Sequence, residues 1–418
     1  MSTFERHVLD NGLRILTANL PYAQSVTCMI MIAAGSRYET PDTNGIAHFS
    51  EHMFFKGTER RPDARAIAGE IDSIGGEFNA FTSKESTAYF VRCAADHRDV
   101  ALDVLVDMLR NSRFDSGEID REKGVIVEEM NMYFDTPRDY IGGVYDELLY
   151  GDQPLGWDII GKKETVRAAT RETFRGYLDR WYHPERMVVG IAGRIGDDAV
   201  ERVSALLGDL PASTTGAPSP VQGYMNGRVK VFTKASDQAH VVVGVPSYPL
   251  EHPDRYALQM LATVLGGGMS SRLFTEVRER RGLAYYVYGV NHSYTDAGSL
   301  YSQAGVDITR IDEALTTIAT ELKGMTTAVP ADELEKARSF SKGRFVLQLE
   351  NPQGLISFGL RKEVLEGRAP DPEEVLAGIS AVTAEDVQRV AQDLLADDKL
   401  RLAVIGPFDD AERFEKLL

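Results

Sequence analysis

Residues 45–57 read GIAHFSEHMFFKG and place three ionisable side chains within an apolar segment. His48, Glu51 and His52 stand at positions i, i+3 and i+4 of this stretch. On an α-helix these spacings bring the three side chains to one face, because successive residues turn by about 100°. Two imidazoles and a carboxylate on one face of an apolar helix predict a functional site.

The simplest function for these three side chains is to form a metal site. Zinc in a catalytic site takes three protein ligands, commonly histidine nitrogens and one carboxylate, and keeps one position for water. His48 and His52 would supply two nitrogens, and Glu51 would take a proton from the bound water. The alternative is a pair of core histidines satisfied by hydrogen bonds. The alternative suits a lone histidine better than this combination, so we favour the metal site.

The third ligand must come from another part of the chain. Residues 116–135, SGEIDREKGVIVEEMNMYFD, predict a helix on which Glu122 and Glu129 share a face. Glu128 points about 100° away from Glu129. Helical phase alone does not choose between Glu128 and Glu129 as the ligand.

The chain is organised as two similar halves. Residues 210–223, LPASTTGAPSPVQG, are typical of a linker and separate a half at 1–209 from a half at 224–418. In each half a predicted strand leads into a helix, a turn and a second helix. Strands and helices alternate, but hairpin signals indicate an α+β fold of two duplicated α/β halves, each a largely antiparallel sheet packed with helices.

Two pairs of equivalent positions support the duplication. Tyr89 corresponds to Tyr301 and Ile119 to Leu334, at offsets of 212 and 215 residues. A similar offset of 209 places only apolar residues opposite the three ionisable ones of the opening stretch, namely Ala257, Met260 and Leu261. The first half therefore carries the chemistry, and the second half lacks the metal site.

Charge and composition restrict the classes of partner. The 418 residues carry a formal net charge of -17, which argues against nucleic acid and would attract basic peptides. Cys28 and Cys93 have no metal-ligand spacing, and we expect a reducing compartment. We find no signal peptide and no apolar run long enough for a bilayer, so the prediction is a cytoplasmic protein without a membrane partner.

Several motifs together resemble those of the pitrilysin family of metallopeptidases. His-x-x-Glu-His is the inverted zinc-protease motif. The resemblance is closest to the branch that includes the mitochondrial processing peptidase β subunit and its bacterial relatives. It extends over nearly the whole chain, through AAGSRYE (33–39), HFSEHMFFKGT (48–58), GGEFNAFTSKESTAY (75–89), REKGVIVEEM (121–130), PLGWDIIG (154–161) and LGGGMSSRLFTEVRERRGLAYYVY (265–288).

The resemblance implies roles for particular residues. It assigns the third zinc ligand to Glu129, with Glu122 as the carboxylate that orients the site, and one zinc ion per chain. Arg278 and Tyr285 match the family pair that contacts substrate near the scissile carbonyl. A further match is the strand on which family members bind extended peptide, here Asn79, Ala80 and Phe81.

From the resemblance we expect a zinc-dependent endopeptidase that cleaves peptides, or unfolded and presequence-like segments, with metal-activated water. The expected assembly is a homodimer, because longer relatives enclose a chamber with four such halves. The rival interpretation is a non-catalytic structural or partner subunit of the same fold. The complete set of His48, Glu51, His52 and Glu129 favours the enzyme.

Overall fold

The computed structural model describes residues 4–213, 216–225 and 227–418, so residues 214 and 215 of the predicted linker lie outside the described part. The chain forms two compact units, each assembled from three segments. Unit 1 comprises Met1–Met130, Asp158–Ser219 and Val346–Pro372, and unit 2 comprises Asn131–Trp157, Pro220–Phe345 and Glu373–Leu418. The predicted boundaries at 209 and 224 concern the duplicated halves of the sequence, whereas the packed units are discontinuous.

Unit 1 contains a six-stranded sheet in the order β1-β2-β6-β3-β5-β4. The pair β2–β6 is parallel, and the other neighbouring pairs are antiparallel. The strands are β1 (Glu5–Val8), β2 (Arg14–Asn19), β3 (Ser25–Ile32), β4 (Glu77–Thr82), β5 (Thr87–Ala94) and β6 (Met187–Gly193). The helices of this unit are α1 (Ile46–Phe54), α2 (Ala64–Ser73), α3 (Arg98–Asn111), α4 (Ser116–Asp135, its last turn in unit 2), α6 (Lys163–Ala168), α7 (Arg171–Trp181), α8 (Ala199–Leu207) and α12 (Pro352–Glu366).

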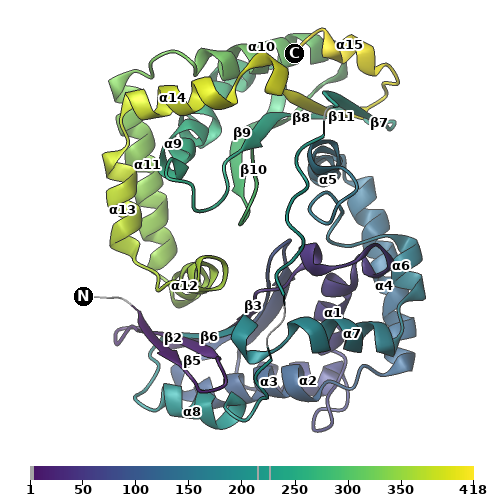
Figure 1. Cartoon of the computed structure of the whole chain (residues 1–418), viewed down its shortest axis with the longest axis vertical. Coiled ribbons are helices and arrows are strands. Elements are labelled where there is room, and N and C mark those ends of the chain that lie inside the picture. The colour runs from purple at the N-terminus through teal and green to yellow at the C-terminus, as the bar shows by residue number, and fades with distance from the viewer. Residues whose placement is uncertain (1–3, 214–215, 226) are drawn as a thin grey trace. The chain divides into compact units, whose positions relative to one another are not determined.

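Both faces of this sheet are buried, which explains why β3 is apolar almost throughout. Successive side chains of a strand point to opposite faces. Cys28 and Ile30 of β3 belong to the core shared with α1, α3, α7 and α8, and Met29 and Met31 belong to the core shared with α12. Figure 1 shows α12 and the α2, α3 and α8 group on opposite faces of the sheet.

Unit 2 repeats this arrangement with five strands in the order β7-β11-β8-β10-β9. Again one pair, β7–β11, is parallel and the others are antiparallel, so the prediction of duplicated, largely antiparallel halves is confirmed. The strands are β7 (Val229–Thr233), β8 (Gln238–Ser247), β9 (Ala284–Ser293), β10 (Gly298–Asp307) and β11 (Arg401–Gly406). The helices are α5 (Pro137–Tyr150), α9 (Arg255–Gly266), α10 (Ile311–Gly324), α11 (Ala331–Leu349, its last turn in unit 1), α13 (Pro372–Ala381), α14 (Ala384–Leu394) and α15 (Ala411–Glu415).

Each sheet is covered on one face by a helix from the other half of the sequence. Helix α5 precedes the linker but packs on β7, β8 and β11, and α12 follows the linker but packs on β2, β3 and β6. The two helices begin at equivalent positions, Pro137 and Pro352, which differ by 215 residues as Ile119 and Leu334 do. This exchange makes the units discontinuous.

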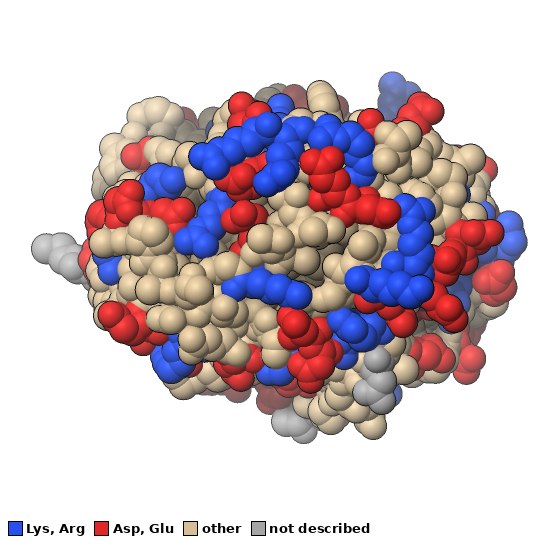
Figure 2. All heavy atoms as spheres, turned by 90° about the horizontal axis from the view of Figure 1, so that it is seen from above, with Lys and Arg blue, Asp and Glu red and all other residues tan. Residues whose placement is uncertain are grey.

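The surface of unit 2 around α10, α14 and α15 carries both signs of charge. Arg413 of α15 pairs with Asp312 of α10, and Arg389 of α14 pairs with Asp254. Figure 2 shows basic side chains lying among acidic ones over the face seen from above. The acidic excess of the chain therefore does not form a one-signed patch on this face. Among the described residues, no helix has the length and apolarity needed to cross a membrane.

Candidate metal centre

Helix α1 presents the three ionisable residues of the opening stretch, and a buried carboxylate fixes where this helix begins. Glu39 accepts hydrogen bonds from the backbone N–H of Gly45 (2.8 Å), the backbone N–H of Ala47 (2.8 Å) and the side-chain amide of Asn44 (3.0 Å). Burial raises the pKa of Glu39 to about 8, and these hydrogen bonds act against that rise. Gly45 has a φ of 95°, and a Cβ there would lie 2.7 Å from the carbonyl oxygen of Ile160, so only glycine fits.

His48, His52 and Glu129 bring three potential ligand atoms within 4.8 Å of one another. The Nε2 atoms of His48 and His52 lie 3.7 Å and 3.5 Å from the two carboxylate oxygens of Glu129. These separations exceed an ordinary hydrogen bond. They are close to the separation of about 3.4 Å between ligands that each lie about 2.1 Å from one tetrahedral zinc ion. The geometry fits a shared cation.

The protonation state of His48 also suits a metal. Burial, and then the neighbouring His52, lower the pKa of His48 to about 3. The imidazole is therefore neutral at ordinary pH, and the neutral form is the one that binds metals. The rings of His48 and His52 lie 4.6 Å apart between centroids, as expected one helical turn apart.

Glu122 holds His52 from the side opposite the ligand atom. Its Oε1 lies 2.9 Å from Nδ1 of His52, and its Oε2 pairs with the Lys56 ammonium at 2.6 Å. Burial acts to raise the pKa of Glu122, but the hydrogen bonds with His52 and Lys56 outweigh it, so its pKa is lowered. A carboxylate that accepts the Nδ1–H leaves Nε2 of His52 with its lone pair toward Glu129.

Glu51 lies on the same face of α1 but does not join the cluster of ligand atoms. Its Oε2 accepts a hydrogen bond of 2.5 Å from the hydroxyl of Thr82, at the end of β4. Burial raises the pKa of Glu51, and the hydrogen bond from Thr82 acts in the opposite direction. A carboxylate with a raised pKa is better matched to exchanging protons near neutral pH.

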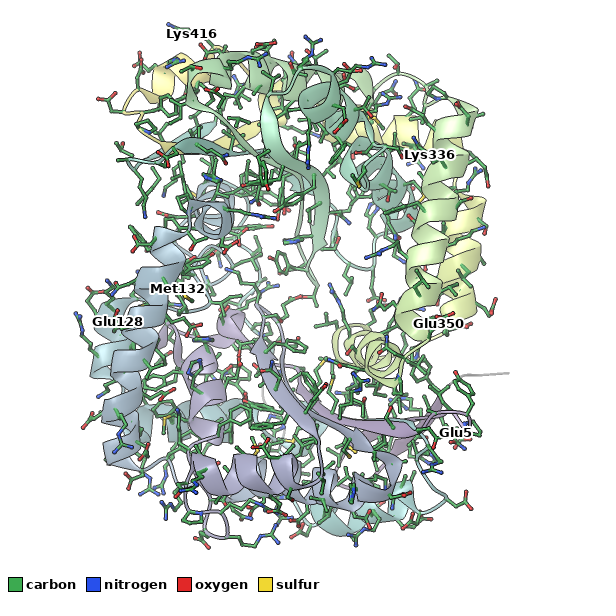
Figure 3. All side chains as sticks on the ribbon, turned by 180° about the vertical axis from the view of Figure 1, so that it is seen from behind. Glu5, Glu128, Met132, Lys336, Glu350 and Lys416 are labelled. Carbon is green, nitrogen blue, oxygen red and sulfur yellow. The ribbon has the colours of Figure 1, made fainter. Side chains whose placement is uncertain are left out.

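The structure separates the two adjacent glutamates of α4. Glu129 is half-buried and turned toward the histidines, whereas Glu128 is exposed. Figure 3 shows Glu128 on the outward side of α4. The geometry therefore brings Glu129 and not Glu128 to the cluster.

Strand β4 forms the edge of the sheet beside this site. It is the last strand in the order and pairs with β5, where Ala80 lies opposite Tyr89. Asn79 and Phe81 are exposed and Ala80 is half-buried, so the three predicted substrate-binding residues lie on a strand with an accessible outer edge. Such an edge offers unpaired backbone groups to an extended peptide.

Arg278 and Tyr285 belong to unit 2, whereas His48, His52 and Glu129 belong to unit 1. The Arg278 guanidinium lies 5.8 Å from the centre of the Tyr285 ring. Tyr285 is 72% exposed, an unusual degree of exposure for a tyrosine. The two predicted partners are thus neighbours, on the π-helical segment Phe274–Arg280 and on β9.

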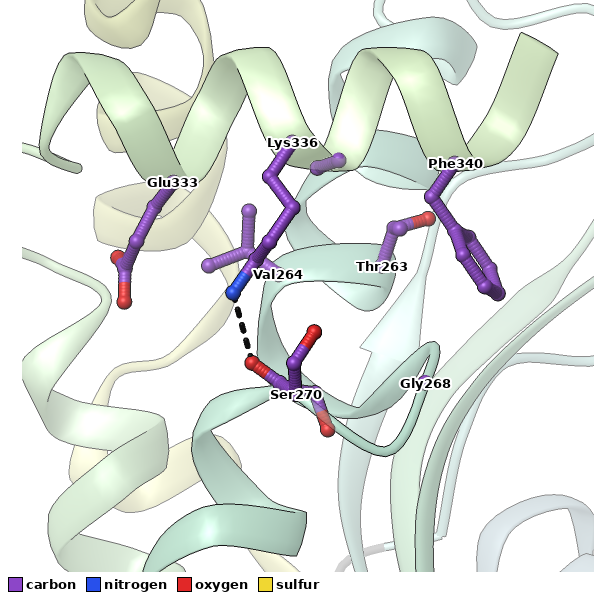
Figure 4. Close-up of a pocket in the computed structure, with 9 residues that line it drawn as sticks. Thr263, Val264, Gly268, Ser270, Glu333, Lys336 and Phe340 are labelled. Carbon is purple, nitrogen blue, oxygen red and sulfur yellow. Dashed lines mark hydrogen bonds between the residues drawn. The ribbon is translucent and has the colours of Figure 1, made fainter. Parts of the chain in front are cut away.

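A hollow elsewhere in unit 2 lies between α9, the glycine-rich loop after it and α11. Its two charged side chains are engaged. Lys336 donates to the carbonyl of Ser270 (Figure 4), and Glu333 pairs with Arg272. Its lining of Thr263, Val264, Gly268, Ser270, Ser271, Glu333, Lys336, Ala337 and Phe340 contains no histidine. This hollow does not rival the cluster on α1.

Three side chains around the cluster were not singled out from the sequence, namely Glu39, Lys56 and Thr82. Thr82 shares a strand face with Ala80, so the period of two along β4 was the available signal. Lys56 lies one turn beyond His52. Glu39 carries no such local signal, because two of its three partners are backbone N–H groups at the start of α1, which begins seven residues later.

Comparison with known proteins gives a consistent picture. The family described as insulinase (peptidase family M16) matches residues 14–162, and the peptidase M16 inactive domain matches residues 168–340. A Bacillus subtilis protein named uncharacterized zinc protease YmxG is 38% identical over 406 residues, covering 96% of this chain and 98% of that protein. An uncharacterized zinc protease of Streptomyces coelicolor is 37% identical over 422 residues, covering 99% and 91% of the two chains.

Two solved structures share the fold. A protease from Helicobacter pylori aligns with a TM-score of 0.87 at 22% identity, over 97% of this chain and 100% of that one. The peptidase M16 inactive domain from Pseudomonas fluorescens aligns with a TM-score of 0.89 at 18% identity, over 97% and 98%. At these identities the likeness concerns the fold alone.

Proposed function

The chain belongs to peptidase family M16, and on that premise we propose that it is a zinc-dependent endopeptidase. The observation that carries the proposal is the convergence of His48, His52 and Glu129 next to the unligated carboxylate of Glu51. Relatives named as zinc proteases support the same activity.

In this proposal His48, His52 and Glu129 hold one zinc ion. When bound, zinc would lower the pKa of a water molecule and polarise the peptide carbonyl. Glu122 keeps His52 in the tautomer whose Nε2 can bind metal. The neutral state of His48, maintained by burial, serves the same end.

Glu51 moves the proton. Its carboxylate accepts a proton from the attacking water as the new C–O bond forms at the peptide carbonyl carbon. It then delivers that proton to the leaving nitrogen as the C–N bond breaks, so that one water molecule is consumed for each peptide bond. The raised pKa of Glu51 supports both directions of transfer near neutral pH.

We propose that substrates bind as an extra strand on β4. The exposed edge formed by Asn79, Ala80 and Phe81 supports this, because main-chain hydrogen bonds there would accept many sequences. The substrates would be peptides or unfolded, presequence-like segments. The net charge of -17 favours basic ones.

We further propose a homodimer, with Arg278 and Tyr285 contributing to a substrate site. A permanent cation beside an exposed phenol suits the stabilisation of a developing oxyanion. Mixing Glu51→Gln chains with Tyr285→Phe chains tests whether Arg278 and Tyr285 of one subunit act on the metal site of the other subunit. Activity recovered in confirmed mixed dimers would support sharing between subunits, and no recovery would contradict it.

The deciding experiment is cleavage of a mixed peptide pool by zinc-loaded protein, read by mass spectrometry. Glu51→Gln serves as the inactive control, because it removes the base and keeps the size of the side chain. We expect cleavage by the wild type and a loss of about 10²–10⁴-fold in kcat for Glu51→Gln. Equal products from both proteins would contradict the proposal.

The rival function is that of a non-catalytic partner subunit. Family M16 includes a domain described as inactive, which matches residues 168–340 of this chain. A wild-type protein that binds zinc and cleaves no peptide would favour this role. A reducing, cytoplasmic setting is also part of our proposal, supported by the buried, unpaired state of Cys28 and Cys93.

A further inference from the structure

The two carboxylate oxygens of Glu51 have different surroundings. Oε2 accepts the 2.5 Å hydrogen bond from the hydroxyl of Thr82. Oε1 makes no hydrogen bond or ion pair with any residue in the ranges 4–213, 216–225 and 227–418. One oxygen is therefore held by the protein, and the other is available to a water molecule or a substrate.

The position of Thr82 is fixed by the turn that follows it. Thr82 pairs with Thr87 at the end of the β4–β5 hairpin, and the N–H of Ser83 donates to the carbonyl of Ser86 at 2.8 Å. Two further backbone hydrogen bonds, from Ser36 to Ser83 (3.1 Å) and from Arg37 to Lys84 (2.8 Å), attach this turn to residues 35–39. A Cβ at residue 35 would lie 2.1 Å from the Ser83 carbonyl oxygen, so Gly35 permits the contact.

A buried ion pair secures the same turn. Arg37 and Glu85 lie 2.7 Å apart with side chains only 2% and 5% exposed. Breaking a buried pair of this kind leaves an uncompensated charge, so the turn has little freedom to move. Thr82, the residue before the turn, is accordingly held in place.

The same short segment also fixes the other partner. Glu39, at the end of residues 35–39, binds the first N–H groups of α1, the helix that carries Glu51. Residues 35–39 thus hold both the turn next to Thr82 and the start of the helix that carries Glu51. A hydrogen bond between two groups fixed in this way is prepared before substrate arrives, and such preparation lowers the cost of reaching the reactive geometry.

We infer that Thr82 is a positioning residue for proton transfer. Its hydroxyl holds Oε2 of Glu51, so that Oε1 is the atom that takes the proton from water and gives it to the leaving nitrogen. The donor from Thr82 stays on Oε2 throughout, and no other co-reactant is needed. This inference rests on the proposed function.

The first test compares Thr82→Val, which removes the hydroxyl at constant shape, with Thr82→Ser, which restores it. Thr233→Val is the matched control, because Thr233 also ends a strand and donates its hydroxyl to a backbone carbonyl, that of Phe408. We expect Thr82→Val to lower kcat about 10–100-fold, the range for a lost hydrogen bond to a charged group, with KM changed less than about twofold. Thr82→Ser and Thr233→Val should stay within about threefold of wild type.

A second readout needs neither zinc nor catalysis. In metal-free protein, thermal unfolding midpoints of wild type, Thr82→Val, Glu51→Ala and the double variant form a thermodynamic cycle. We expect Thr82→Val to lower the midpoint when Glu51 is present and to have a smaller effect in the Glu51→Ala background. The zinc dissociation constant of Thr82→Val should remain within about twofold of wild type, because no ligand is changed.

The outcomes separate this inference from the proposed function. Active wild type with unchanged kcat in Thr82→Val, or equal midpoint losses in both backgrounds, overturns the positioning role alone. Wild type that cleaves no peptide overturns the endopeptidase, and the positioning role with it. Failure of Thr82→Ser to restore kcat, with a normal midpoint, also counts against the hydroxyl as the operative group.

Discussion

Helices α1 and α9 occupy equivalent places in the two units and differ in the face that each presents. Helix α1 packs beside the edge strand β4, and α9 packs beside β9, the edge strand of the second sheet. The polar side chains of α1 are half-buried at the positions where α9 has the fully buried apolar residues Ala257, Met260 and Leu261. The fold is thus built equally well without the polar residues, which indicates that α1 keeps them for chemistry.

The helices that follow differ in the same way. At the offset of 215 residues, Glu122 of α4 corresponds to Ala337 of α11, and Glu129 corresponds to Arg344. Every carboxylate or imidazole of the cluster is therefore replaced in the second unit. Loss of the whole set is expected when a duplicated site is no longer used, whereas unrelated structural residues would be lost independently.

Transplanting the α9 residues into α1 should produce the largest effect. The triple variant His48→Ala, Glu51→Met and His52→Leu is expected to lose zinc binding and all peptide cleavage. The free energy of unfolding of its metal-free form should be unchanged or raised by about 1–4 kcal/mol, as when buried ionic groups are replaced by apolar ones. Urea unfolding, metal analysis and a peptide assay measure the three quantities. A strongly destabilised variant would show that the polar residues of α1 are structural.

The two exchanged helices provide the next comparison. Glu363 of α12 is fully buried and pairs with Arg6 (3.0 Å) and Arg14 (3.4 Å) of the first sheet. Glu147 of α5 pairs with Lys230 of the second sheet at 2.5 Å, but both side chains are partly exposed. We expect Glu363→Ala to lower the free energy of unfolding by about 3–5 kcal/mol, because it leaves the largely buried Arg14 guanidinium without a carboxylate that compensates its charge.

Glu147→Ala is the control for Glu363→Ala. Its ion pair is screened by solvent, and its loss should cost less than about 1 kcal/mol. Urea unfolding of both variants measures the difference. Similar losses in the two would mean that burial does not distinguish the exchanged helices.

The sequence predicted those parts of the molecule that depend on local periodicity. The common face of His48, Glu51 and His52, the shared face of Glu122 and Glu129, and the strands around Tyr89 and Tyr301 all follow from repeats of 3.6 or two residues. The exchange of α5 and α12 could not be predicted in this way, because helical periodicity does not specify which sheet a helix covers. The partner of Thr82, Glu51, lies 31 residues away, and periodicity does not specify such a contact. Glu39 was missed although its partners lie only five to eight residues further along the chain, because two of them are backbone N–H groups, which carry no side-chain pattern.

The two adjacent glutamates of α4, Glu128 and Glu129, allow a ligand to be compared with a neighbouring residue of the same charge. Glu129→Gln should weaken zinc binding by at least about 100-fold, because it replaces a charged ligand. Residues that only hold a ligand in place typically change metal affinity by about 10–100-fold when they are mutated, so the loss of a ligand should exceed that range. Glu128→Gln changes the same charge one position away on the exposed side of α4 and should leave the affinity within about twofold. Competition with a chromogenic chelator measures both dissociation constants. Equal effects would mean that the net charge of α4, and not a ligand at position 129, controls the affinity.

The smallest effect is expected at Glu122, which contacts the cluster only through His52. Removing its carboxylate leaves Nδ1 of His52 without its acceptor and Lys56 without its 2.6 Å partner. Glu122→Ala should therefore weaken zinc binding by about 10–100-fold while His48, His52 and Glu129 remain. Glu118→Ala, one turn earlier on α4, removes a carboxylate whose partner is Arg121 and should not change the affinity. The same chelator competition measures the zinc dissociation constant of both variants. An unchanged dissociation constant in Glu122→Ala would mean that the packing of α1 alone orients His52. The difference between α1 and α9 would then depend on the residues of these two helices, without a contribution from α4.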